Sequence, residues 1–196
     1  MARRYQHNLQ ELKILILQTA EVIVIKKGFH GLNARLIAMD IGYTVGSIYM
    51  VFDSMADLVL HLNVRALNNL VSFLEQRQIL KQDVTIDALI KSYCDYIKNN
   101  TNLWRLLFEY QSHNKTNGLP AWYLDELEYA FVRIVAIFQA YLPPLAGTDQ
   151  ILMIKTFWAG LHGILLLSYS GQIGSAYQQN TQDACIQVLV EKLLNC

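Results

Sequence analysis

The stretch IAMDIGYTVGSIYMVF, Ile37 to Phe52, has turn-forming residues at its centre and apolar residues on both sides. Gly42 is suited to ending one short helix, which Asn33 can cap at its start. Thr44 can cap the next helix, which we expect to make one and a half to two turns and to end near Val51. Two short helices joined by such a turn are typical of a DNA-reading helix-turn-helix.

The charge of this stretch is unusual for a surface that meets DNA. No lysine or arginine stands between Arg35 and Arg65. The acidic residues in that interval are Asp40, Asp53 and Asp57. The whole chain has a formal net charge of zero, so it lacks the overall basic character of many nucleic-acid-binding proteins. Any DNA contact must therefore use local cations and uncharged groups.

Composition and periodicity favour an all-α fold. Hydrophobic residues make up 53% of the 196 residues and charged residues 16%. Only 3 prolines and 10 glycines interrupt the chain, and we find no convincing strand pattern or internal repeat. We expect an all-α protein of about nine helices, with a helix-turn-helix domain over residues 1–54 and a second helical domain over residues 55–196.

Capping and loop signals divide the chain into helices. The first helix should run from about Asn8 to Lys27 and stop at Gly28. The segment Ser54 to Asp57 resembles a capping box that opens a long helix. Loops are expected at Asn114–Gly118 and at Pro143–Pro144. The later helices are expected at about residues 55–80, 83–100, 102–109, 120–141, 149–171 and 182–194.

The order of these elements resembles the TetR family of bacterial transcriptional regulators over about residues 10–60. The second half also resembles one group of TetR ligand domains, because Trp158, His162 and Gly163 form its Trp-x-x-x-His-Gly signature (WHG) and residues 96–108 look like the helix-break-helix that precedes it. The residues that carry the N-terminal match are Ile16, Ala20, Ile23, Val24, Gly28, Phe29, Arg35, Ile37, Ala38, Gly42, Thr44, Gly46, Ser47, Tyr49, Phe52 and Leu58.

The resemblance implies a ligand-responsive regulator, in most cases a repressor, that binds a palindromic double-stranded DNA operator as a homodimer. The first three helices would read the operator, and the C-terminal helices would form the dimer and enclose a small-molecule pocket. Ligand would change the separation of the two reading heads. The DNA-binding positions implied are Asn33, Arg35, Thr44, Val45, Gly46, Ser47, Tyr49 and Met50.

The chain departs from the family pattern where the family often has basic or hydrogen-bonding residues, at Val45, Val51 and Met55. In one interpretation the head still reads DNA through hydroxyls, backbone amides and apolar contacts, with cations from Arg35 and the tail Arg3–Arg4. In the alternative, the chain is a small-molecule or protein-binding dimer that has lost sequence-specific DNA binding. Under that alternative, the four apolar positions Val45, Met50, Val51 and Met55 are scaffold or protein-contact residues. Three further residues have a purely structural interpretation under either hypothesis: Gly42 and Gly46 serve a turn and close helix packing, and Tyr49 caps the core of the module.

Aromatic residues in the middle and late helices favour a small hydrophobic effector, apolar or aromatic, in a largely hydrophobic cavity. Each of them can equally be a core residue. His162 is either a hydrogen-bonded core histidine or one polar anchor for the effector. The expected effector-binding residues are Trp104, Phe108, Tyr123, Trp158 and His162.

The last two helices are the expected dimer interface. No charged residue stands between Lys155 and Asp183, and a partner subunit would cover this segment. Its polar residues and glycines argue against a membrane span. The stripe expected at the interface consists of Ile151, Ile154, Trp158, Leu161, Leu165 and Tyr169.

The sequence gives little support to catalysis, since it contains no nucleophile elbow, phosphate-binding loop or zinc-protease motif. We therefore expect no enzyme activity, no catalytic residues, no metal and no cofactor. The three cysteines, Cys94, Cys185 and Cys196, are widely spaced, as is usual for incidental thiols in a reducing cytosol. The polar start of the chain shows no secretory signal, so we expect a cytoplasmic protein.

Overall fold

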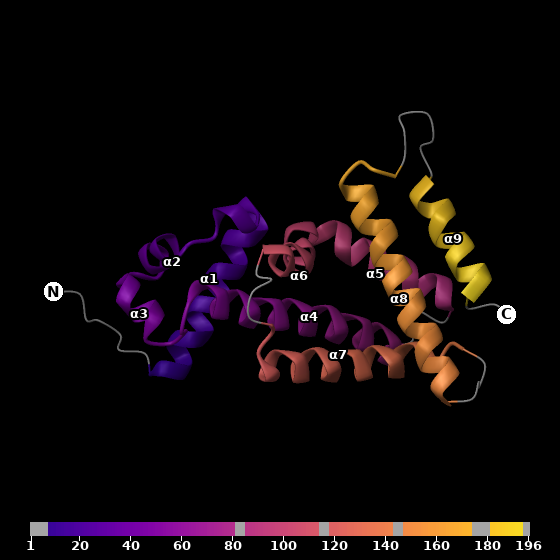
Figure 1. The fold of residues 1–196 in the computed structure, drawn as a ribbon, viewed down its shortest axis with the longest axis horizontal. Coiled ribbons are helices and arrows are strands. Elements are labelled where there is room, and N and C mark those ends of the chain that lie inside the picture. The colour runs from indigo at the N-terminus through magenta and orange to yellow at the C-terminus, as the bar shows by residue number, and fades with distance from the viewer. Residues whose placement is uncertain (1–7, 81–84, 114–117, 143–146, 174–180, 194–196) are drawn as a thin grey trace. The chain divides into compact units, whose positions relative to one another are not determined.

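A computed structural model describes residues 8–80, 85–113, 118–142, 147–173 and 181–193 of the chain. In these ranges the fold is all-α, with nine α-helices, one short 3-10 helix and no strand (Figure 1). This confirms the predicted fold class. The elements are α1 (Leu9–Lys27), η1 (Phe29–Gly31), α2 (Ala34–Ile41), α3 (Val45–Tyr49), α4 (Met55–Ile79), α5 (Ile86–Asn99), α6 (Thr101–His113), α7 (Ala121–Gln139), α8 (Gly147–Tyr169) and α9 (Thr181–Leu193).

Most helix ends lie close to the positions expected from capping residues. Asn8 forms a capping box with Glu11 at the start of α1, and Gly28 ends the helix with a φ of 69°. Two helices differ in length. The third helix ends at Tyr49, earlier than expected, while α6 continues to His113. The expected breaks at Pro143–Pro144 and at residues 114–117 lie outside the described residues.

The start of α4 has a shifted capping box. The Ser54 hydroxyl accepts a hydrogen bond from the Asp57 amide at 3.1 Å, as expected. The Asp57 carboxylate, however, accepts one from the amide of Asp53 at 3.2 Å and not from that of Ser54. Both otherwise unpaired amides are satisfied, so the long helix begins at a defined residue directly after the helix-turn-helix.

Packing divides the chain into two compact units. The first unit comprises Met1–Phe73 and Tyr93–Ala130, and the second comprises Leu74–Ser92 and Phe131–Cys196. These units are defined by packing within one chain, so the functional boundary after residue 54 stays a prediction.

The first unit is organised around α1, which packs against α2, η1 and α6. Its inner face places Ile16, Ala20 and Val24 in full burial. Ile48 of α3 and Phe52 beyond it close the same core, at 0% and 1% exposure. A helix of five residues is too short to be stable alone, so these two buried side chains hold α3 in place. The core continues into α4, α6 and α7 through buried apolar residues that include Leu58, Leu62, Leu103, Leu106 and Tyr123.

In the second unit, α8 and α9 lie side by side (Figure 1). Gly160 lies where they meet, because an added Cβ would come within 2.9 Å of the Leu189 Cδ1 atom on α9 and that side chain would have to shift. Arg133 of α7 forms a bidentate ion pair with Glu75 at the end of α4. Its Nε and Nη2 atoms lie 2.8 and 2.6 Å from the two carboxylate oxygens. This pairing lowers the pKa of the Glu75 carboxyl.

One helix segment, Asp149–Tyr169, is long and apolar enough to cross a membrane by length and composition, and only 22% of its most apolar window is buried within the chain. Length and composition are weak evidence for a span, because interface helices of water-soluble oligomers have the same properties.

Candidate DNA-reading head and effector site

Capping groups fix the two short helices of the reading head. The Asn33 Oδ1 atom accepts a hydrogen bond from the Leu36 amide at 2.9 Å, and Thr44 Oγ1 accepts one from the Ser47 amide at 3.2 Å. Between them Gly42 ends α2 with a φ of 72°, a left-handed conformation that glycine adopts without strain. Asn33 and Thr44 therefore have structural roles as caps in addition to any contact with DNA.

The outer face of α3 is apolar and hydroxyl-bearing. Val45, Tyr49 and Met50 are exposed, Met50 at 72%. Thr44 and Gly46 are also exposed, while Ser47 is half-buried and its hydroxyl lies 3.0 Å from that of Thr44. Of the residues that the sequence implied for DNA contact, all but the half-buried Ser47 are exposed, including Asn33 and Arg35 at α2.

The apolar residues that depart from the family pattern fall into two groups. Val51 and Met55 are partly buried and pack against the core of the first unit, so they have a structural reason to be apolar. Val45 and Met50 are exposed and pack against nothing comparable. Met39 on α2 is also an exposed apolar residue, at 67%, and sequence reasoning missed it.

Two structural explanations for head residues do not hold. A Cβ added at Gly46 would meet Thr44 Oγ1 at 3.6 Å, an ordinary contact, so the packing of this chain does not require glycine there. Tyr49 is 47% exposed and lies outside the buried core, so it does not cap it. The nearest cation in the sequence, Arg35, is exposed on α2, while Arg3–Arg4 lies outside the described residues.

Hydrogen bonds at two positions of α1 connect it to α6 and α4. Asn102, at the start of α6, donates from Nδ2 to the carbonyl of Ile25 near the end of α1, at 3.0 Å. On the same helix, Glu21 accepts hydrogen bonds from Arg65 at 2.6 Å and from Asn69 at 3.2 Å, both on α4. A displacement of α6 or α4 would therefore be transmitted to the helix that supports the reading head.

A third contact centres on His61 of α4. Its ring stacks on Trp122 of α7 with centroids 4.3 Å apart, and its Nε2 atom lies 3.2 Å from the ammonium of Lys13 on α1. Burial, followed by the charge of Lys13, lowers the pKa of His61, although Asp57 and Glu126 oppose the shift. A neutral ring can accept the Lys13 hydrogen bond, so this cluster connects α1, α4 and α7.

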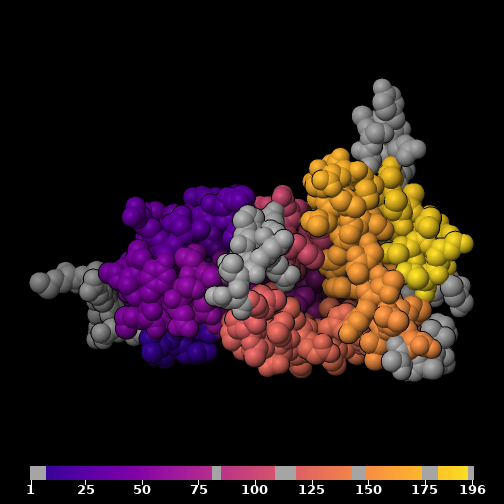
Figure 2. Space-filling model, in the orientation of Figure 1, coloured from indigo at the N-terminus to yellow at the C-terminus, as the bar shows by residue number. Residues whose placement is uncertain are grey.

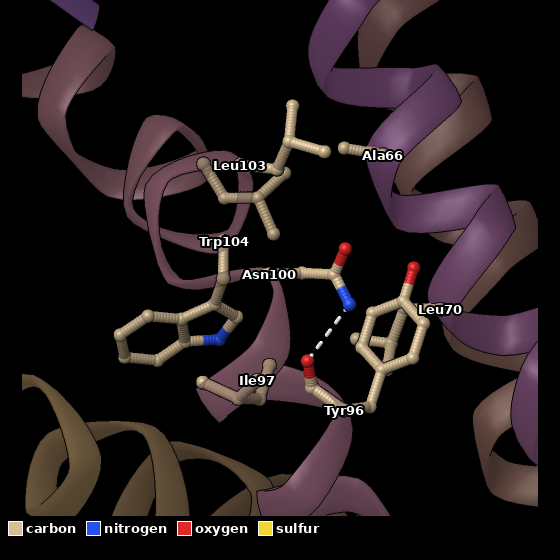
Figure 3. A pocket seen from close by; sticks show the side chains of 8 residues that line it. Ala66, Leu70, Tyr96, Ile97, Asn100, Leu103 and Trp104 are labelled. Carbon is tan, nitrogen blue, oxygen red and sulfur yellow. Dashed lines mark hydrogen bonds between the residues drawn. The ribbon is translucent and has the colours of Figure 1, made fainter. Parts of the chain in front are cut away.

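A small apolar cavity lies in the first unit between α4, α5 and α6. Figure 3 shows Ala66 and Leu70 projecting from α4 toward the residues of α5 and α6. The Asn100 Nδ2 atom donates to the carbonyl of Tyr96 at 2.9 Å. The cavity volume is about 10 Å³, which is about the space one water needs. Its lining consists of Ala66, Leu70, Tyr96, Ile97, Asn100, Leu103, Trp104 and Leu107.

The predicted effector-binding residues are divided between the two units. Trp104 lines the cavity, and its ring lies 5.1 Å from that of Phe108. Tyr123 is fully buried in the core of the first unit. Trp158 and His162 belong to the second unit, where their rings are 4.5 Å apart.

His162 is placed by its own helix. Its Nδ1 atom lies 2.8 Å from the carbonyl of Trp158, one turn earlier. A carbonyl can only accept, so Nδ1 carries the proton. Burial lowers the pKa of His162 to about 4, and the hydrogen bond to Trp158 only partly opposes this shift. The ring is therefore neutral at physiological pH, and its hydrogen bond within α8 explains the Trp-x-x-x-His spacing locally.

The expected dimer stripe is wrong for three of its six residues, although Ile151 at its start is exposed. Ile154, Leu161 and Leu165 are fully buried within the chain, so they cannot form an outer surface. The exposed side of α8 is rotated from them and contains Leu152, Thr156, Ala159, Leu166 and Leu167. Gly163 lies on this side, since an added Cβ there meets nothing within 4 Å. Figure 2 shows α8 and α9 together on the viewed face, in orange and yellow. Because α8 is apolar on all sides, periodicity alone did not distinguish its inner from its outer face.

Sequence reasoning also missed a buried asparagine. Asn63 of α4 is fully buried, and it is flanked on its helix by the buried residues Leu60, Leu62 and Ala66. Its position on an apolar helical face was a visible signal, because asparagine is mostly exposed in proteins.

Comparison with protein families gives two matches. Residues 16–62 match the N-terminal domain described as bacterial regulatory proteins, tetR family. Residues 86–193, more than half of the chain, match the tetracyclin repressor-like C-terminal domain. No curated protein matches the chain.

Several solved structures share the fold. A protein of unknown function from Rhodococcus sp. RHA1 is 20% identical with a TM-score of 0.69, covering 98% of this chain and 100% of its own. A TetR family regulator from Agrobacterium tumefaciens is also 20% identical, with a TM-score of 0.62, covering 95% and 100%. The multidrug binding protein EbrR, solved with imidazole, is 18% identical with a TM-score of 0.62, covering 94% and 95%.

The depressed pKa of His162 predicts a pH dependence of stability. In the unfolded chain, His162 is protonated below its ordinary pKa near 6.5. In the native protein it is protonated only near pH 4. Stability therefore falls as pH decreases through this window, by up to about 3 kcal/mol from this group. His162→Asn, which keeps an N–H donor near Nδ1, should reduce the loss measured by denaturant unfolding between pH 7 and pH 4.5. An unchanged loss in the variant would show that His162 does not cause it.

Proposed function

Because the chain belongs to the TetR family of bacterial regulatory proteins, we propose that it is a ligand-responsive transcriptional repressor that binds a palindromic operator as a homodimer. A small apolar or aromatic effector releases it. The observation that carries this proposal is the reading head, where α2 and α3 are capped and anchored in one position while α3 turns an exposed face to solvent. The proposed setting is the cytoplasm, where operator DNA is accessible.

The proposed DNA contacts are mostly uncharged. Val45 and Met50 can touch thymine methyl groups, and the hydroxyls of Thr44 and Tyr49 can bond phosphates or base edges. Glycine at position 46, which the fold itself does not require, leaves the start of α3 open to close approach by the DNA backbone. Among the described residues of each reading head, Arg35 is the proposed cationic contact to a DNA phosphate.

The proposed release begins at the cavity lined by Trp104. A ligand larger than one water must push α4, α5 and α6 apart, since the cavity of about 10 Å³ is too small for it. Asn102 then moves with α6, and through Ile25 the end of α1 moves as well. EbrR, which has the same fold, is described as a multidrug binding protein, and this supports a hydrophobic effector here. The WHG subtype of the C-terminal half stays part of the proposal.

The proposed dimer interface is the outer side of α8 together with α9. Leu152, Leu166 and Leu167 on α8 and Val188 on α9 are exposed apolar residues. A second subunit would cover them, and two reading heads would then face half-sites about one helical turn of DNA apart, or a multiple of it.

A second candidate function follows from the same head. Met39, Val45 and Met50 are exposed apolar residues of the helix-turn-helix, and exposed apolar side chains also serve in protein binding. On this reading the chain is a family member that binds small molecules or proteins and has lost sequence-specific DNA binding.

Selection from a random duplex library at low salt distinguishes the two functions. The repressor predicts enrichment of a palindromic motif. Tyr49→Ala and Arg35→Gln should each weaken binding to it by about tenfold, because one phosphate or base contact contributes about 1–3 kcal/mol. Tyr129→Ala, at an exposed tyrosine of α7, is the matched control and should bind as the parent chain does. If no motif rises above bulk DNA, the second candidate is favoured.

Asn102→Ala tests the release step. The variant should bind the operator within about threefold of the parent chain, yet respond about five- to tenfold less to any compound that releases the parent, because coupling of this size corresponds to one contact. Operator affinity would be titrated with and without the compound. Asn99→Ala, an exposed neighbour, should respond normally. An equal response from Asn102→Ala would show that the signal does not pass through Ile25.

A further inference from the structure

The amide of Asn63 is fully buried, and both its oxygen and its nitrogen lack a hydrogen-bond partner in the described structure. Buried polar groups are nearly always paired, because leaving one unpaired forfeits its hydrogen bonds to water. Both halves of this amide are unpaired at once. Folding alone gives no reason to place asparagine at this position, since its neighbours on α4 include the buried apolar residues Leu60, Leu62 and Ala66.

Asn63 shares a helical face with the cavity lining. Ala66 and Leu70, which line the cavity, follow it on α4 by three and seven residues. On an α-helix such residues lie on one side, and the first step is a rise of about 4.5 Å. Figure 3 shows this side of α4 turned toward Leu103 and Asn100. The unpaired amide therefore lies about one turn along α4 from the cavity.

The cavity lining limits which ligand group can pair with this amide. None of the residues that line it is charged, and burial raises the pKa of Tyr96, so its phenol stays neutral. A ligand carboxylate or ammonium would be desolvated there without a counter-charge. Asn63 itself offers two donors on Nδ2 and an acceptor on Oδ1. A neutral group with a carbonyl and an adjacent N–H pairs with both.

We propose that Asn63 is the polar anchor of the effector site, and that the effector is a neutral, largely aromatic or apolar molecule with a carboxamide or lactam edge. The ligand carbonyl accepts from Nδ2, and the ligand N–H donates to Oδ1. This inference rests on the proposed function for its assignment of the cavity to an effector. It adds the chemical class of that effector and the residue that selects it.

The test compares three probes of one shape on the full chain: 2-naphthamide, 2-methylnaphthalene and 2-naphthoate. Equilibrium dialysis without DNA gives their dissociation constants. The parent chain should bind 2-naphthamide about tenfold or more tighter than either analogue. The hydrocarbon leaves the Asn63 amide unpaired, and the carboxylate is desolvated without a counter-charge. Asn63→Leu should lose this preference and bind 2-methylnaphthalene at least as well as the parent. Equal affinities in the parent, no binding of any probe, or an unchanged preference in Asn63→Leu would each overturn the proposal.

Stability gives a second, ligand-free readout. Asn63→Leu should have a melting temperature equal to or above that of the parent, since it removes an unpaired polar group. Asn100→Leu is the matched control at the same cavity. Its amide is already bonded to the Tyr96 carbonyl, so this variant should melt at a lower temperature. If Asn63→Leu melts lower as well, the amide is satisfied within the protein, for instance by a buried water, and the proposal fails.

The two proposals fail separately. The probe experiments contain no DNA, so they succeed or fail whether or not an operator exists. Asn63→Leu lies outside the reading head, so it should select the same operator as the parent chain. If the chain bound the amide selectively but selected no operator, the proposal for Asn63 would stand and only the proposed repressor function would fail.

Discussion

The burial of one helix, α1, constrains everything else in the first unit. Its inner face, through Ile16, Ala20 and Val24, packs in the core that also holds Ile48 and Phe52. The same helix accepts hydrogen bonds from α6 and α4 on its polar atoms. A helix packed at interior density cannot adapt continuously to its neighbours, so it moves with them or stays in place. In the proposed release step, that property would carry a displacement at the cavity to the reading head.

The reading head shows how a DNA-binding geometry can be kept without cationic side chains on its recognition helix. Capping by Asn33 and Thr44, the glycine turn at Gly42 and the buried anchor Ile48 are all independent of charge. They fix where the outer residues of α3 lie. Charge would add affinity and salt dependence, whereas apolar and hydroxyl contacts add sequence preference with less affinity. The proposed repressor therefore depends on dimerisation to combine two weak heads into one useful affinity.

Much of the fold was predictable because local signals and tertiary packing agree. Asn8, Asn33, Gly42 and Thr44 each mark a helix end in the sequence and serve as that end in the structure. Agreement fails where a helix is apolar on every side. The three- and four-residue spacing of α8 was correct, but the predicted interface stripe included three residues of the inner face, since only tertiary packing decides between the faces.

The candidate sites were less predictable for a related reason. Exposure of Tyr49 and Met50 follows from the burial of Ile48, because residues one and two positions further along a helix point away from it, so much of the head surface could be anticipated once the helix was placed. The effector side could not. Trp104 lines a cavity, whereas Tyr123 is core, and their sequence contexts are alike. Asn63 was overlooked because a buried polar residue is informative only after its partners have been counted.

The salt dependence of operator binding tests the central claim, an operator-reading head with few charge contacts, most directly. Each neutralised phosphate contributes about −0.9 to the slope of log affinity against log salt. With Arg35 and the tail Arg3–Arg4 as the cations of each head, the dimer should show a slope no steeper than about −5 on its selected duplex. A slope near −9 or steeper would contradict the account, because it would require cationic contacts that the reading head does not provide.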